Sequence, residues 1–162
     1  MTGPGRTRAA GCLAAAVAAT ALGLAGCASD GPRNSAGQVT ESSPADAFSL
    51  RVGDCTGPLT TGTIEQVVLV PCAEPHSWEA FAATELTGDD FPGAGSVQDQ
   101  AEEFCNARFK DFVGVSAGKS DYDLTVLQPT RQTWTSAGDR TVTCLAGKDG
   151  GDIEGSLKGA GK

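Results

Sequence analysis

The sequence predicts an α+β fold: a small, mainly antiparallel sheet with one packed helix, braced by two disulfides. Three observations lead to this prediction. One amphipathic stretch has a helical period, several short apolar stretches are separated by prolines, and four cysteines lie within residues 48–162. The chain has 162 residues, which leaves room for one domain after an export segment and a linker.

Residues 1–26 have the pattern of a lipoprotein signal peptide. Arg6 and Arg8 precede an apolar run that ends at Leu24 and is shorter than the roughly 20 residues a membrane-spanning helix needs. The run closes with Leu24-Ala25-Gly26-Cys27, which resembles the lipobox of bacterial lipoproteins. This resemblance implies that Cys27 is lipidated with fatty-acyl groups such as palmitate, after cleavage before it. We therefore expect an anchor in the cell membrane, with the chain on the extracytoplasmic face. An ordinary secretory leader is the alternative.

The segment 27–47, which follows the predicted cleavage site, is rich in Ser, Gly, Pro, Asn and Asp. We expect it to form a flexible tether with a root-mean-square span on the order of 25 Å. The extracytoplasmic domain is then expected over residues 48–162.

Five segments of this domain have strand character: 48–52, 64–70, 78–86, 122–128 and 140–145. Pro71, Pro75, Pro92 and Pro129 mark breaks between elements. Alternation along 140–145 places Val142 and Cys144 on one face of the last strand, so Cys144 can face the core.

A helix is predicted between the third and fourth strands. Ser96 and Asp99 form a capping pair, and Gly114 can end the helix. The residues of its apolar stripe are Val97, Ala101, Phe104, Cys105, Phe109 and Phe112. This face is expected to pack on the sheet.

The four cysteines of the domain are Cys55, Cys72, Cys105 and Cys144. An even set in an exported domain suggests two disulfides, for which three connectivities exist. We favour Cys55 with Cys72, near the ends of adjacent strands, and Cys105 with Cys144, which would join the helix to the sheet.

Several short motifs carry a family resemblance. In order, they are Val52-Gly53-Asp54-Cys55, Val70-Pro71-Cys72-Ala73-Glu74-Pro75-His76, the helix with Cys105, Pro129-Thr130, Trp134, Gly138-Asp139-Arg140, Cys144 and Gly155-Ser156-Leu157-Lys158-Gly159. Their order and the placement of the cysteines resemble the septum-formation domain family of actinobacterial envelope proteins. The resemblance implies an extracytoplasmic domain associated with septum formation, and it implies no catalytic residues.

Composition excludes several function classes. The formal net charge is −8, and no lysine- or arginine-rich run is present, so nucleic-acid binding is not expected. His76 is the only histidine, which excludes a histidine-rich zinc site, and we predict neither a metal nor a cofactor. A nucleophile formed by Cys72 and His76 is the alternative reading of that motif, but a disulfide-bonded Cys72 has no thiolate to offer.

Four residues are candidates for a binding surface. Asp139 and Arg140 lie near Trp134 in the sequence, and an aromatic side chain with a charged pair is common at interfaces. The alternative is a corner salt bridge over a half-buried ring. His76 is the fourth candidate, and its alternative is a structural contact in the turn after Cys72.

Together these features predict a non-enzymatic binding domain on a lipid anchor. The expected partner is an envelope or division protein or a cell-wall component, in septum formation or envelope maintenance. A cell-wall hydrolase is one alternative, which would need a general acid and base in one cleft. A small-ligand carrier is the other, which would need a deep apolar pocket.

Overall fold

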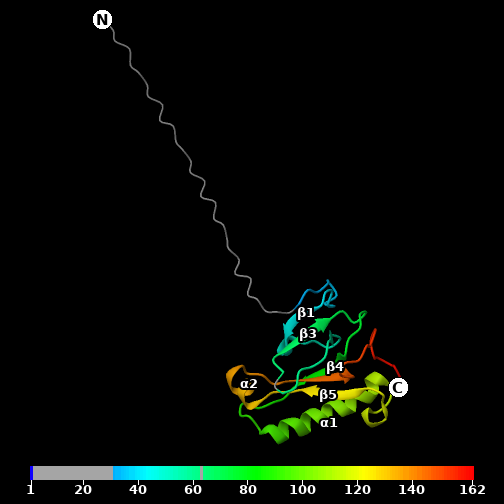
Figure 1. Cartoon of the computed structure of the whole chain (residues 1–162). Coiled ribbons are helices and arrows are strands. Elements are labelled where there is room, and N and C mark those ends of the chain that lie inside the picture. The colour runs from blue at the N-terminus through cyan, green and yellow to red at the C-terminus, as the bar shows by residue number, and fades with distance from the viewer. Residues whose placement is uncertain (2–30, 63) are drawn as a thin grey trace.

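The computed structural model describes residues 1, 31–62 and 64–162 of the chain. In this part of the chain a six-stranded sheet has the order β1-β3-β2-β4-β6-β5, and all neighbouring strands are antiparallel (Figure 1). The strands are β1 (Ser43–Asp46), β2 (Cys55–Thr56), β3 (Gln66–Val70), β4 (Trp78–Glu85), β5 (Asp123–Leu127) and β6 (Thr141–Gly147). The predicted α+β class is confirmed. Cys27 and the predicted signal peptide lie outside the described residues.

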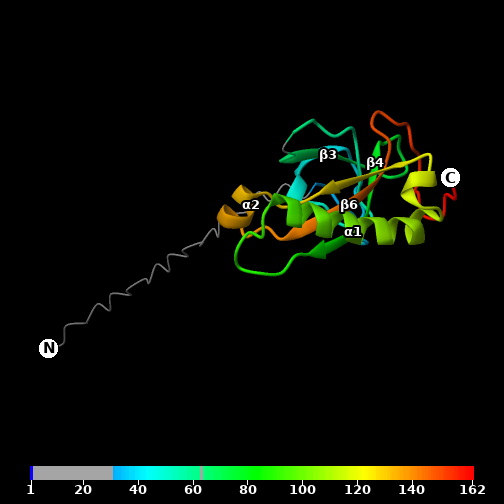
Figure 2. The same ribbon diagram turned by 90° about the horizontal axis from the view of Figure 1, so that it is seen from below.

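The main helix, α1 (Ala94–Val113), covers one face of the sheet (Figure 2). Its buried residues recur at a spacing of four and are Val97, Ala101, Cys105, Phe109 and Val113, as an amphipathic helix requires. The helix ends at Gly114, whose φ of 101° is left-handed and suits glycine. It begins earlier than predicted, after Gly93, without a side-chain cap.

The face under α1 holds the larger part of the core. Val142, Cys144 and Ala146 of β6 point toward the helix, as the alternation predicts. Phe81 of β4 adds an edge contact with Phe109, at 5.8 Å between ring centroids. The disulfide Cys105–Cys144 joins the helix to the sheet at this place, and the second disulfide joins Cys55 to Cys72. The favoured connectivity is confirmed.

The opposite face of the sheet is concave. Leu127 of β5 packs against a cluster that includes Ala45 of β1, and also against Trp78 and Leu145. Since β1 and β5 are the two ends of the strand order, their contact through one cluster means that the sheet curls until its edges approach each other.

The N-terminal part of the sheet differs from the sequence predictions. The predicted strand over 48–52 is wrong, because residues Ala47–Ser49 form the 3-10 helix η1, whose N-cap Asp46 accepts a hydrogen bond from the Phe48 amide at 2.9 Å. The strand lies earlier, at β1, and pairs with β3.

The predicted flexible tether over 27–47 is also corrected from residue 31 on. The Arg33 guanidinium forms an ion pair with the Asp54 carboxylate, at 2.6 and 2.8 Å. Gly31, with a φ of 66°, lies so close to Leu69 of β3 that a Cβ there would be 2.9 Å from a leucine methyl. These contacts make residues 31–47 part of the folded domain.

The chain after β6 packs back onto the sheet. The Glu79 carboxylate of β4 accepts hydrogen bonds from the Ser156 hydroxyl and the Leu157 amide, both at 2.7 Å. Leu157 is only 3% exposed and joins the core beside α1. The glycine-rich C-terminal motif is therefore a structural segment.

Two short helices complete the described structure: the 3-10 helix η2 (Ala117–Lys119) and α2 (Arg131–Ser136), which precedes β6. Neither these helices nor α1, within residues 31–62 and 64–162, combines the length and hydropathy that a membrane span requires.

Candidate functional site

The structure places Trp134 inside the domain. The side chain is 2% exposed, and its indole N–H donates to the Asp89 carbonyl oxygen at 3.0 Å. The Arg140 guanidinium lies 3.7 Å from the centre of the ring, a cation–π contact. A buried ring that is already covered does not serve as an exposed binding aromatic.

Asp139 and Arg140 hold the corner around this tryptophan. Arg140 donates to the carbonyl oxygens of Gly88, Trp134 and Asp139 at 3.1, 3.1 and 2.9 Å. The two oxygens of the Asp139 carboxylate accept from the Thr133 hydroxyl at 3.0 Å and from the Thr141 amide at 2.9 Å. The chain around Trp134 is thus held by the Arg140 guanidinium over the indole ring and by hydrogen bonds to the backbone.

His76 lies at the other end of the sheet. It lies two residues before the start of β4, whereas Arg140 pairs with Leu86 just beyond the end of β4, so the whole strand, about 25 Å long, lies between them. Its backbone pairs with Ile153, and its Nδ1 lies 2.8 Å from the Glu74 carbonyl oxygen. The structure therefore brings together three of the four candidate residues and leaves His76 apart.

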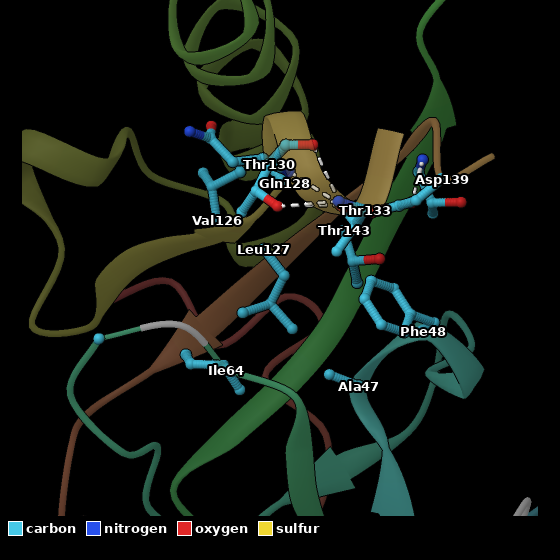
Figure 3. Close-up of a pocket in the computed structure, with 12 residues that line it drawn as sticks. Ala47, Phe48, Ile64, Val126, Leu127, Gln128, Thr130, Thr133, Asp139 and Thr143 are labelled. Atoms are coloured by element: carbon cyan, nitrogen blue, oxygen red, sulfur yellow. Dashed lines mark hydrogen bonds between the residues drawn. The ribbon is translucent and has the colours of Figure 1, made fainter. Parts of the chain in front are cut away.

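A pocket of about 360 Å³ lies where the two edges of the curled sheet approach each other. We call it the apolar pocket. Figure 3 shows Phe48, Ile64 and Leu127 facing one another across it. Its lining residues are Ala47, Phe48, Gly62, Ile64, Val126, Leu127, Gln128, Thr130, Thr133, Asp139, Thr141 and Thr143. Phe48 is 49% exposed, so its ring is accessible to a ligand at the entrance of the apolar pocket.

Hydroxyl groups form the polar side of the apolar pocket. Thr130 and Thr133 come from the start of α2, where each side chain binds the other's backbone amide in a capping box, at 2.9 and 3.1 Å. This reciprocal bonding fixes both threonines. Asp139 is the one carboxylate among the residues that line the pocket, and both of its oxygens are engaged.

A second hollow, of about 640 Å³, lies between α1 and β5. We call it the polar groove. Gln98, Glu102 and Asn106 line it from the helix; Asp123, Leu124, Thr125 and Val126 line it from β5, and Ala117 and Gln128 complete it. The Gln98 amide donates to the Glu102 carboxylate at 2.8 Å, so the helix side is partly ordered before any ligand arrives.

The comparisons with known proteins agree with the sequence resemblance. A family model described as septum formation matches residues 23–144. The chain belongs to the septum-formation family. The match includes all four cysteines of the two disulfides.

Two relatives of this septum-formation domain are uncharacterized membrane proteins of Mycobacterium tuberculosis, from strains CDC 1551 / Oshkosh and ATCC 25618 / H37Rv. Each is 27% identical over 102 residues, which cover 57% of this chain and 22% of the relative. The chain thus spans about a fifth of the length of these curated relatives. No solved structure matches.

Most motifs that carry the septum-formation resemblance have structural roles. Asp54 holds Arg33, the cysteines form disulfides, and Arg140 covers Trp134. Thr130 and Asp139 are the motif residues that also line the apolar pocket. The rest of that pocket comes from residues that no motif singled out.

Sequence reasoning missed both hollows. The Thr130-x-x-Thr133 spacing was the available signal for α2, and with it for the polar side of the apolar pocket. No local signal marks the apolar side, because Phe48 and Leu127 meet there only through the curl of the sheet. Among the side chains that the structure describes, no group of three or more His, Cys, Asp or Glu could hold a metal ion.

Proposed function

We propose that this chain is a lipoprotein anchored through Cys27 to the extracytoplasmic face of the cell membrane, and that its septum-formation domain is a non-catalytic binding module. The module acts in septum formation or envelope maintenance and takes an envelope or division protein as its partner. The observation that carries the binding role is the pair of hollows that flank β5, one apolar and one polar.

The covalent chemistry supports the proposed compartment. Two disulfides form and persist in oxidising spaces outside the cytoplasm. The lipobox-like Leu24-Ala25-Gly26-Cys27 supplies the anchor, and the matched relatives carry the description of membrane proteins. All three support an exported, membrane-attached domain.

The apolar pocket favours binding over hydrolysis. A hydrolase acting on the wall needs a general acid and a general base that reach one substrate bond. The pocket offers one carboxylate, and hydrogen bonds hold both of its oxygens. A small-ligand carrier is the second candidate function, because a volume of about 360 Å³ falls within the range of small-molecule sites.

The anchor is tested by replacing Cys27 with alanine. The unmodified chain should partition into the detergent phase of a Triton X-114 extract, and the Cys27→Ala variant should move to the aqueous phase or the medium. Cys12→Ala is the matched control, because it removes a cysteine from the same leader and should leave partitioning unchanged. Unchanged partitioning of Cys27→Ala would overturn the anchor.

The binding role is tested by crosslinking in dividing cells, followed by mass spectrometry of the products. We expect recovery of envelope or division proteins above the background of an unrelated lipoprotein. Release of soluble wall fragments by the purified domain would instead support a hydrolase, and co-purification of a small apolar molecule would support a carrier.

A further inference from the structure

We propose that β5 receives an extended segment of a partner protein as an additional strand, in which apolar and basic residues alternate. An apolar side chain of this segment enters the apolar pocket, and its basic side chains face the polar groove. The inference deepens the proposed binding function and rests on it.

The first support is the open edge of β5. This strand is last in the strand order and pairs only with β6. Within the described ranges, the backbone hydrogen bonds outside the regular elements include none from residues 123–127. Every second residue of an edge strand directs its N–H and C=O groups outward, so β5 offers a ladder of unpaired groups.

The second support is that β5 carries few of the devices that normally protect an edge. Edge strands are usually blunted by proline, charged side chains, a bulge or short length, and the one charge on β5 is Asp123 at its first residue. β5 reads Asp-Leu-Thr-Val-Leu and pairs with β6 without a register shift. By contrast, β1 at the other end of the sheet contains Pro44, which cannot donate to a new strand. Only one of the two edges is thus open to strand addition.

The third support is the position of the two hollows. Val126 pairs with Cys144 on the face toward α1, whereas Leu127 pairs with Thr143 on the concave face. A strand added beside β5 would direct successive side chains to these same two faces. One set would meet the polar groove and the other would meet the apolar pocket, as in peptide recognition by strand addition.

The charge of the polar groove selects the partner. Glu102 and Asp123 line it, together with the amides of Gln98 and Asn106, and no Lys or Arg is among the residues that line it. Lysine or arginine side chains of an added strand would therefore be attracted there. Pairing of two copies through β5 would instead place the acidic groups of both copies together, which like-charge repulsion disfavours.

The test uses the full chain in detergent micelles and a fluorescent peptide of about eight residues in which lysine alternates with valine. Fluorescence anisotropy should show saturable binding, and a matched peptide with glutamate in place of lysine should bind at least about tenfold more weakly. Glu102→Gln and Asp123→Asn should each weaken the lysine peptide about two- to fivefold, as expected for exposed ion pairs. Glu103→Gln is the control, since it removes the same charge from an exposed position of α1 outside the polar groove and should change nothing.

Backbone pairing has its own test. Two forms of the lysine peptide carry N-methyl groups on alternate residues, in opposite frames. One frame removes the donors that face β5 and should bind at least about tenfold more weakly, while the other frame should bind like the parent peptide.

Several results would overturn the proposal: equal binding of the lysine and glutamate peptides, equal loss in both methylated frames, absence of binding up to about 1 mM, or a dimer formed through β5. Crosslinking in cells distinguishes a failure of strand addition from a failure of the proposed binding function. If Glu102→Gln with Asp123→Asn leaves the recovered partner unchanged, strand addition fails while the binding function stands; if no envelope or division protein is recovered at all, the binding function fails.

Discussion

Replacing Arg33 with alanine should destabilise the domain, although the sequence pattern assigned this residue to a flexible tether. The Arg33 guanidinium binds both oxygens of the Asp54 carboxylate, at 2.6 and 2.8 Å, and the two side chains are 9% and 4% exposed. Without Arg33, a nearly buried carboxylate loses its cationic partner.

The magnitude follows from this burial. Breaking a buried ion pair by removing one partner costs roughly 3–5 kcal/mol. Asp54 keeps the hydrogen bond from the Arg51 amide at 2.8 Å, which favours the lower end, so we expect a loss of about 3 kcal/mol in the free energy of unfolding. A small domain has about 5–15 kcal/mol in total, so the variant should still fold.

Urea denaturation followed by tryptophan fluorescence measures this loss, because Trp78 and Trp134 are both buried. Lys158→Ala is the control, since that side chain is exposed and should change stability by less than about 0.5 kcal/mol. Arg33→Met combined with Asp54→Asn should recover most of the loss, because no unpaired charge is left. A loss below about 0.5 kcal/mol for Arg33→Ala would refute the inclusion of residues 31–47 in the cooperative fold.

Three further predictions concern the packing of the sheet. Cys105→Ala with Cys144→Ala should lower the free energy of unfolding by about 4 kcal/mol, because the disulfide spans 39 residues; an unchanged urea midpoint would contradict this. Glu79→Gln places an amide where two donors converge and should cost about 2 kcal/mol, with faster hydrogen exchange at the Leu157 amide as its signature. Gly147→Ala should cost about 3 kcal/mol, because a Cβ at this position would collide with the backbone just before β4, and thermal unfolding would measure the loss.

The helix α1 and the strands β3, β4, β5 and β6 could be predicted from local patterns. The helical period around Phe109 is strong enough to place α1 within three residues, and alternation in β6 places Cys144 under the helix. These signals work because each buried face repeats with the period of its own element. The favoured pairing of Cys105 with Cys144 used these signals, whereas that of Cys55 with Cys72 rested on their positions near the ends of adjacent predicted strands; both pairs form.

The N-terminal strand and the site could not be predicted in this way. β1 reads Ser-Pro-Ala-Asp, which has no strand propensity, and it forms because β3 pairs with it. Phe48 looked like a strand residue, but the cap at Asp46 turns the chain into η1 instead. The sequence left open whether Trp134 is an exposed binding aromatic or a half-buried ring, and in the structure Arg140 and Phe91 cover it. The pairing of β1 and the Phe91 contact with Trp134 depend on residues distant in the sequence, whereas the Asp46 cap and the Arg140 contact join near neighbours.

The close packing of Gly31 on β3 restricts how far the proposed anchor lets the domain travel. The four chain steps from Cys27 to Gly31 span at most about 14 Å. A flexible linker of about 20 residues would let the domain move much farther from the membrane. A lipidated Cys27 would thus hold this domain close to the bilayer surface. Any protein that pairs with β5 must then present its strand within a few nanometres of the lipid.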